Sequence, residues 1–63
     1  MDREEVLKYI NIPVRITFIK TRNKLEGILK YTKFMNMDDF YIITKDGKHI
    51  GVNIKDIKNI KVK

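Results

Sequence analysis

The sequence contains no cysteine, and His49 is its only histidine. The chain therefore has neither a disulfide to reinforce a small core nor the thiol and imidazole ligands of a structural zinc site. It also has no apolar run close to the roughly 20 residues of a membrane-spanning helix. Its start, Met-Asp-Arg-Glu-Glu, does not resemble a signal peptide. We therefore expect a cytoplasmic protein that binds no metal and does not enter a membrane.

Residue patterns typical of enzymes are missing as well. The sequence shows no nucleophile with a plausible base, no phosphate-binding loop and no carboxylate pair at the spacing of acid–base catalysis. The acidic residues Asp38, Asp39 and Asp46 do not have the spacing of a calcium loop, and we interpret Asp38 and Asp39 as solvated loop carboxylates. We expect a protein that is not an enzyme and needs no cofactor.

The chain is short and basic. Its 63 residues suffice for one domain, and a domain of this size buries only about 60% of the surface that its unfolded chain exposes, so self-association is expected to add burial. The net charge is +6, and the positive charge lies in residues 13–34 and 48–63, on either side of an acidic segment. Such a field attracts polyanions, namely RNA, DNA or an anionic membrane surface, although a lysine-rich surface also serves solubility.

The first residues carry a helix signal. Asp2 and Glu5 have the spacing of a capping box, and apolar residues then recur at helical spacing. Pro13 ends the helix, because its ring removes a backbone donor and favours extended geometry before it. We predict one short helix at about residues 2–10, whose apolar face docks on the rest of the domain.

From Val14 onward apolar and polar residues alternate, which indicates β-strands. Gly27, early in the second alternating segment, indicates a sharp bend or a close backbone approach. Asp46-Gly47 favours a hairpin with a type I′ turn, in which both central residues have positive φ. The predicted strands are 14–18, 24–32, 40–44, 50–54 and 58–62, with loops at 21–23 and 34–39 and a tight 3₁₀ turn at 55–57. A C-terminal helix is the competing interpretation of the last segment, which its β-branched residues disfavour.

This order of elements describes a mostly β protein. We predict a small five-stranded SH3-like barrel at about residues 13–62, preceded by the short helix, in a single domain that spans 1–63.

Three segments carry a family resemblance. Asn23–Leu29 is similar to the first-motif strand of the Sm and Sm-like family, Met35-Asn36 to its methionine-asparagine loop, and Val52–Ile57 falls where its second motif lies. The chain resembles this family, which includes the bacterial RNA-chaperone branch known as Hfq, from Val6 to Val62. The resemblance implies a homo-oligomeric ring that binds single-stranded RNA, uridine-rich or adenine-rich, and that acts as an RNA chaperone. The ring would form by pairing the strand around Ile50 with a neighbour's last strand.

Four residues in two loops are candidates for base contacts. Phe34 offers an aromatic surface on which a base can stack, and the Asn36 amide can read a base edge. Met35 lies between them, in the loop that lines the RNA pore of the resembled family, and the loop of Lys55 corresponds to one where that family places a cation against base or phosphate. The alternative is structural: Phe34 and Met35 plug one end of the barrel, Asn36 shapes the turn, and Lys55 is solvated.

Basic residues near the first predicted hairpin turn are candidates for phosphate contacts. Lys20, Arg22 and Lys24 surround that turn, and Lys33 lies further along. Phosphate contacts add RNA affinity without sequence preference and weaken with salt. A charged turn that keeps the protein soluble and protects strand edges explains the same residues.

Two other functions fit the sequence. An SH3-like module would bind a protein partner in a groove across Tyr31, Phe40 and Tyr41, with lysines serving solubility. A binder of double-stranded nucleic acid would use the basic face alone.

Overall fold

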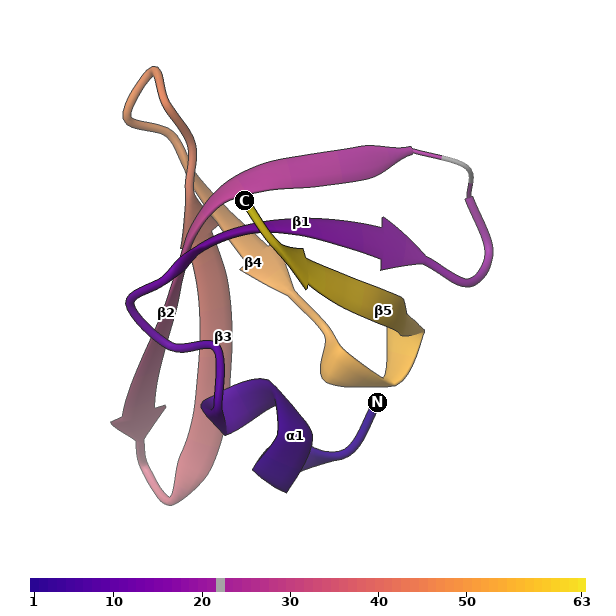
Figure 1. The fold of residues 1–63 in the computed structure, drawn as a ribbon. Coiled ribbons are helices and arrows are strands. Elements are labelled where there is room, and N and C mark those ends of the chain that lie inside the picture. Colours follow the sequence, from indigo (N-terminus) through magenta and orange to yellow (C-terminus); the bar gives the residue numbers. More distant parts are fainter. Residues whose placement is uncertain (22) are drawn as a thin grey trace.

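The computed structural model describes residues 1–21 and 23–63. Its elements are α1 (Arg3–Leu7), β1 (Pro13–Phe18), β2 (Lys24–Phe34), β3 (Met37–Ile43), β4 (His49–Val52), the 3₁₀ turn η1 (Ile54–Asp56) and β5 (Ile57–Val62). The strands form one antiparallel sheet in the order β4-β3-β2-β1-β5 (Figure 1). The prediction of a mostly β fold with five strands and a short N-terminal helix is confirmed.

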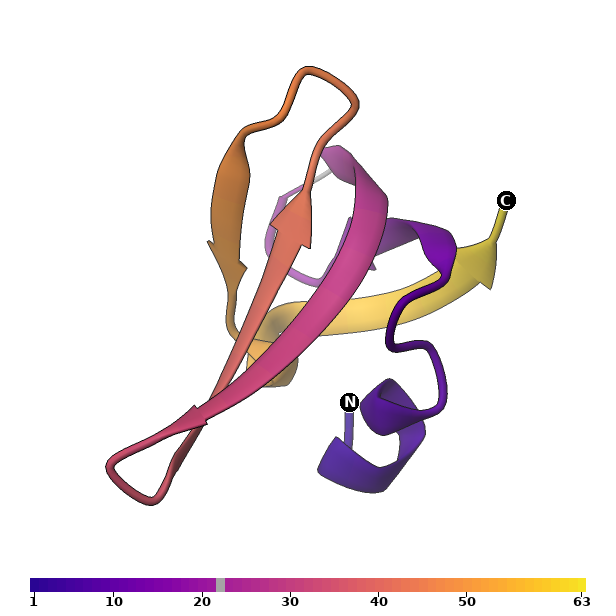
Figure 2. The same ribbon diagram turned by 90° about the vertical axis from the view of Figure 1, so that its left-hand side faces the viewer.

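The long strand β2 joins the two halves of the sheet. Its first residues, Lys24–Ile28, pair with β1, and Ile28–Phe34 pair with β3. Figure 2 shows this strand sweeping across the whole molecule. At Gly27 the end of β3 comes so near that a Cβ would lie 2.3 Å from the Ile43 carbonyl oxygen. The close backbone approach predicted from this glycine is confirmed.

The predicted barrel is not closed. β4 and β5 form the two edges of the sheet and do not pair with each other. β4 has only four residues, and η1 then leads the chain away to β5, which pairs with β1 instead. Both edge strands therefore keep an outer side without a partner among the residues that the structure describes.

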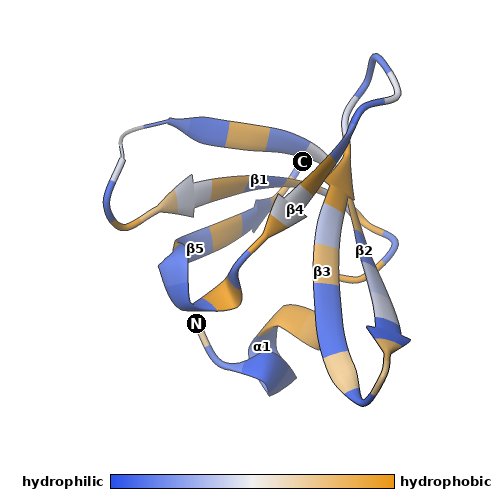
Figure 3. Ribbon diagram, turned by 180° about the vertical axis from the view of Figure 1, so that it is seen from behind, coloured by the Kyte–Doolittle hydropathy of each residue, from blue (hydrophilic) through white to orange (hydrophobic). Residues whose placement is uncertain are grey.

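Apolar side chains from the helix and all five strands form one core. They are Val6, Val14, Ile16, Leu29, Phe40, Ile42, Val52, Ile57 and Ile60. Figure 3 shows hydrophobic and hydrophilic residues alternating along β3, as expected for a sheet with one buried face. α1 contributes Val6, which is fully buried. The predicted docking of the helix on the domain is confirmed.

The α-helix is shorter than the predicted range of 2–10. Asp2 caps its start, but the carboxylate accepts a hydrogen bond from the backbone N–H of Glu4 (2.8 Å), one residue earlier than a capping box requires. Asn11 has a φ of 67° and its N–H donates to a carbonyl of β2 (2.7 Å). The chain has therefore left the helical path before Pro13 opens β1.

The loop predicted at 34–39 is wrong. Phe34 and Met37 pair directly across a two-residue turn, in which Met35 and Asn36 have φ values of 49° and 63°. Positive φ at both central residues is the requirement of a type I′ turn. Polar Asp38 and Asp39 therefore belong to β3, because cross-strand pairing with β2 outweighs their low strand preference.

The second hairpin is confirmed, with a different turn. The Gly47 N–H donates to the Thr44 carbonyl (2.9 Å) and the Thr44 N–H to that of Lys48 (2.9 Å). Gly47 alone in this fully described loop has positive φ (87°), which fits a three-residue loop with a glycine bulge rather than type I′. Further on, η1 confirms the tight turn near 55–57, and β5 excludes the alternative C-terminal helix.

Candidate nucleic-acid interface

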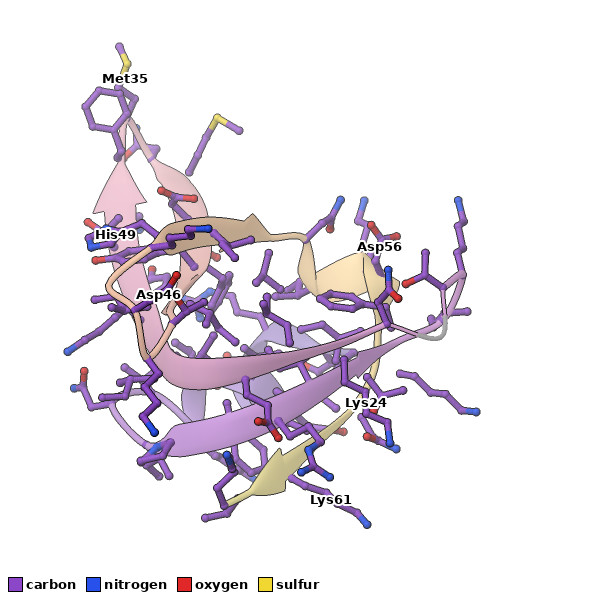
Figure 4. All side chains as sticks on the ribbon, turned by 90° about the horizontal axis from the view of Figure 1, so that it is seen from above. Lys24, Met35, Asp46, His49, Asp56 and Lys61 are labelled. Atoms are coloured by element: carbon purple, nitrogen blue, oxygen red, sulfur yellow. The ribbon has the colours of Figure 1, made fainter. Side chains whose placement is uncertain are left out.

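The tip of the β2–β3 hairpin is apolar and exposed. Phe34, Met35 and Met37 are 69%, 81% and 72% exposed, and Asn36 lies between them. Figure 4 shows the labelled Met35 projecting away from the rest of the molecule. The structural alternative, in which Phe34 and Met35 plug the end of a barrel, is wrong for this chain, because neither side chain is buried. The tip is open to a ligand.

The β2–β3 hairpin is held to the helix by Asp38, one residue pair away from the tip. Its carboxylate accepts hydrogen bonds from the Tyr31 hydroxyl (2.5 Å) and from the Arg3 guanidinium (2.6 Å), and that guanidinium carbon also lies 5.9 Å from the centre of the Tyr31 ring. The Tyr31 hydroxyl and then Arg3 lower the pKa of Asp38, since both stabilise the charged carboxylate. Asp38 is thus not the solvated loop carboxylate that we predicted, and Arg3 is occupied in orienting the hairpin.

Lys55 lies on a groove between the start of β3 and η1. The groove has a volume of about 640 Å³ and is lined by Met37, Asp38, Asp39 and Phe40 from β3 and by Gly51, Val52, Asn53, Ile54 and Lys55. The Asn53 side chain accepts from the Lys55 backbone N–H (3.0 Å) and fixes the turn that presents this lysine. Lys55 and Met37, the residue after Asn36, therefore line the same groove. Asp38 and Asp39 line it too, so the groove carries both signs of charge.

The β1–β2 loop forms a separate basic region. Lys20 and Lys24 line a groove of about 420 Å³, to which β5 adds Lys58. Arg22 lies outside the described residues. Figures 1 and 2 place this loop and the β2–β3 tip in different parts of the molecule. Within one chain the predicted phosphate contacts at Lys20 and Lys24 are thus separated from Phe34 and its neighbours, while Lys33 belongs to the tip.

Lys58 is a basic residue that the sequence did not single out. It follows Ile57, which pairs with Phe18 at a register shift next to the β1–β2 loop. Only this long-range pairing brings Lys58 to Lys20 and Lys24. The signal that could have found it is the apolar pair Ile57 and Ile60 in β5, which are buried and leave Lys58 and Asn59 between them exposed.

Two further cations near the sheet, Arg15 and Lys63, are already paired. The Glu26 carboxylate accepts from the Arg15 guanidinium and from the Lys63 ammonium (3.1 Å). These two cations, Arg15 first, lower the pKa of Glu26. Arg15 and Lys63 are therefore less available for phosphate than Lys20, Lys24 and Lys58.

The groove of the alternative SH3-like module is not formed. Tyr31 and Phe40 pair across β2 and β3, with ring centres 5.0 Å apart, but Phe40 is buried in the core. Tyr41 points to the opposite face of β3, since successive residues of a strand alternate. The three aromatic residues therefore do not share one surface.

No protein-family model matches this chain, and neither a curated protein nor a solved structure matches it. Among the residues described, no helix has the length and apolarity needed to cross a membrane. In the same part of the chain, no three histidine or carboxylate side chains gather where they could hold a metal ion.

Proposed function

We propose that this chain is an Sm-like protein that assembles into a ring through its two sheet edges and binds single-stranded, uridine-rich or adenine-rich RNA as a chaperone. The observation that carries the proposal is the pair of open edge strands, each with an exposed apolar residue on the core side of the sheet. Pairing of these edges between copies would continue the sheet from one chain to the next around the ring.

Each edge strand has an exposed apolar side chain on the core face and free backbone hydrogen-bonding groups. Ile50 on β4 is 37% exposed although it pairs with fully buried Ile42, and Val62 on β5 is 60% exposed although it pairs with fully buried Val14. Cross-strand partners share a face, so both exposed side chains extend the core. Joining β4 of one copy to β5 of the next covers them and satisfies the free backbone groups. Such a head-to-tail contact gives a ring when its rotation closes.

RNA is the ligand that the surface chemistry favours. The net charge of +6 attracts a polyanion, and the Lys20, Lys24 and Lys58 region supplies phosphate contacts. The tip offers Phe34 for stacking and Asn36 for a base edge, with Lys33 beside them. Repetition around a ring brings several copies of each region onto one strand, which raises the apparent affinity.

The ring is tested by measuring the molar mass of the protein in solution and the same quantity for Val62→Lys. We expect the natural chain to be an oligomer and the variant to shift towards the monomer, because the ammonium opposes burial at the joined edge. Ile19→Lys is the matched control: Ile19 is equally exposed, at 60%, but lies in the β1–β2 loop. A natural chain that is strictly monomeric at micromolar concentration contradicts the ring.

RNA binding is tested by competition between oligo-U, oligo-A and duplex DNA at two salt concentrations. We expect the single strands to bind more tightly than the duplex and all affinities to fall with salt. Equal or tighter binding of the duplex favours the double-stranded nucleic-acid binder. No salt-dependent affinity for any of them favours a protein-binding module.

A further inference from the structure

The outer face of the sheet carries a stacked aromatic pair. Tyr41 on β3 and His49 on β4 have ring centres 5.5 Å apart and ring planes inclined by only 16°. Tyr41 lies between buried Phe40 and Ile42, so its side chain points away from the core. Figure 4 shows the labelled His49 beside the β3–β4 loop that contains Asp46. The pair is thus a surface feature that the core does not require.

The position opposite Tyr41 on β4 carries no side chain. Gly51 is the direct partner of Tyr41 on β4, and a Cβ placed on Gly51 would meet nothing within 4 Å. Its backbone conformation is one that other residues adopt freely. Glycine is therefore not needed here for folding, and the missing side chain leaves the strand open at the position paired with Tyr41, at the edge of the Lys55 groove. His49 is itself exposed, so a flat ring can approach the pair.

Cations flank this aromatic pair. Lys30 is the partner of Tyr41 on β2, where its ammonium donates to the Asn11 side chain (2.8 Å). Lys48 directly precedes His49, and its ammonium lies 3.7 Å from the Asp46 carboxylate. Lys30 thus shares the outer face of the sheet with Tyr41, and Lys48 lies at the start of the strand that carries His49. Flat rings with nearby lysines suit the bases and phosphates of a single strand.

We propose that Tyr41 and His49, with the open position at Gly51, form a second stacking site for a base of single-stranded RNA, distinct from the β2–β3 tip. The inference rests on the RNA binding proposed above and extends it to the outer face of the sheet. Pairing of β4 with a neighbour uses its backbone edge and leaves this face uncovered. An RNA strand can therefore occupy it in the ring as well as on a single chain.

The test fills the open space without removing an aromatic residue. Gly51→Val adds a side chain where there is room and favours a strand, so the variant should fold at least as well as the natural chain. We expect its affinity for labelled oligo-A and oligo-U to fall roughly 5- to 150-fold, the range for loss of one stacked base. Asn59→Val is the matched control, since it adds a similar side chain at an exposed position of the other edge strand, and its affinity should be unchanged.

A spectroscopic measurement on the natural chain gives an independent readout. Oligo-A should shift the NMR signals of the Tyr41 and His49 rings, because a stacked base adds its ring current. If the natural chain binds neither oligomer, the proposed function and this inference both fail. If it binds but the ring signals do not move, the inference alone fails even when Gly51→Val binds more weakly, because Gly51 also lines the Lys55 groove. If Gly51→Val binds as tightly as the natural chain, the inference fails as well, and the RNA belongs to the tip and the basic loop.

Discussion

The two hairpin turns on either side of β3 are built in opposite ways. The β3–β4 loop uses Gly47 for its positive φ and surrounds it with polar Lys45, Asp46 and Lys48. The β2–β3 turn instead puts Met35 in a left-handed conformation that costs about 1–2 kcal/mol for a side chain with a Cβ, and it exposes Phe34 as well. A turn selected only for stability would resemble the first. The second combines a less favourable backbone conformation with an exposed apolar surface, which fits the RNA contact proposed for the tip.

The largest effect is expected at the common base of the two hairpins. Gly27→Ala places a Cβ 2.3 Å from the Ile43 carbonyl oxygen, a backbone atom that cannot move aside alone. We expect a loss of roughly 3 kcal/mol or more in the free energy of unfolding. Denaturant unfolding measures it, with Gly51→Ala as the control because its Cβ meets nothing. Equal stability of the two variants would show that the sheet tolerates the added group at Gly27.

Gly47→Val tests the β3–β4 loop, in which glycine supplies the positive φ. The position has open space, so only the positive φ of 87° opposes the side chain. We expect a loss of about 1–2 kcal/mol in the free energy of unfolding, and a smaller one for Gly47→Asn, because asparagine tolerates left-handed geometry. Thermal unfolding of both variants measures the difference. A valine variant as stable as the asparagine variant contradicts the strain argument.

Met35→Gly tests the β2–β3 turn, in which a methionine has positive φ. Glycine relieves the left-handed conformation, and we expect the free energy of unfolding to rise by about 0.5–1 kcal/mol while RNA affinity falls. Met37→Gly is the control, because the same residue type lies there within β3, where glycine weakens the strand. Stability and RNA binding are measured on each variant. A Met35→Gly protein that gains stability and keeps full RNA affinity would remove the tip from the binding surface.

The smallest effect is expected in the free energy of unfolding at acidic pH. The pKa of Asp38 is lower in the folded protein than in the unfolded chain, mainly through the Tyr31 hydroxyl and then Arg3. The unfolded chain therefore takes up the proton at higher pH, and the contribution of Asp38 is present above about pH 4 and lost as the pH falls below it. Unfolding measured against pH should show a shallower acid decline for Asp38→Asn than for Asp39→Asn. Equal slopes would mean that Asp38 does not hold the hairpin to the helix.

Local patterns predicted most of the elements, and long-range contacts explain where they failed. Alternating residues located the strands, and Asp46-Gly47 located a hairpin, because both signals act within a few residues. The helix limit at 2–10 and the loop at 34–39 were wrong, since Asn11 bonds to β2 and Asp38 contacts Arg3, 35 residues away. Phe34, Met35 and Asn36 were found as candidates from their chemistry, whereas Lys58 was missed because only strand pairing brings it to Lys20.

The sequence by itself determined the class of fold and the basic charge, because alternation and composition are local properties. The need for glycine at position 27 was visible as a signal in the sequence, but its cause is the close approach of the end of β3. Tertiary structure decided which strand edges stay unpaired, which side chains are exposed and which distant residues come into contact. It left β4 and β5 as edges, exposed the β2–β3 tip, separated that tip from the basic loop and placed Tyr41 against His49 across two strands. These outcomes depend on which strands pair and in which register, and a shift of one residue would turn every side chain of a strand to the other face.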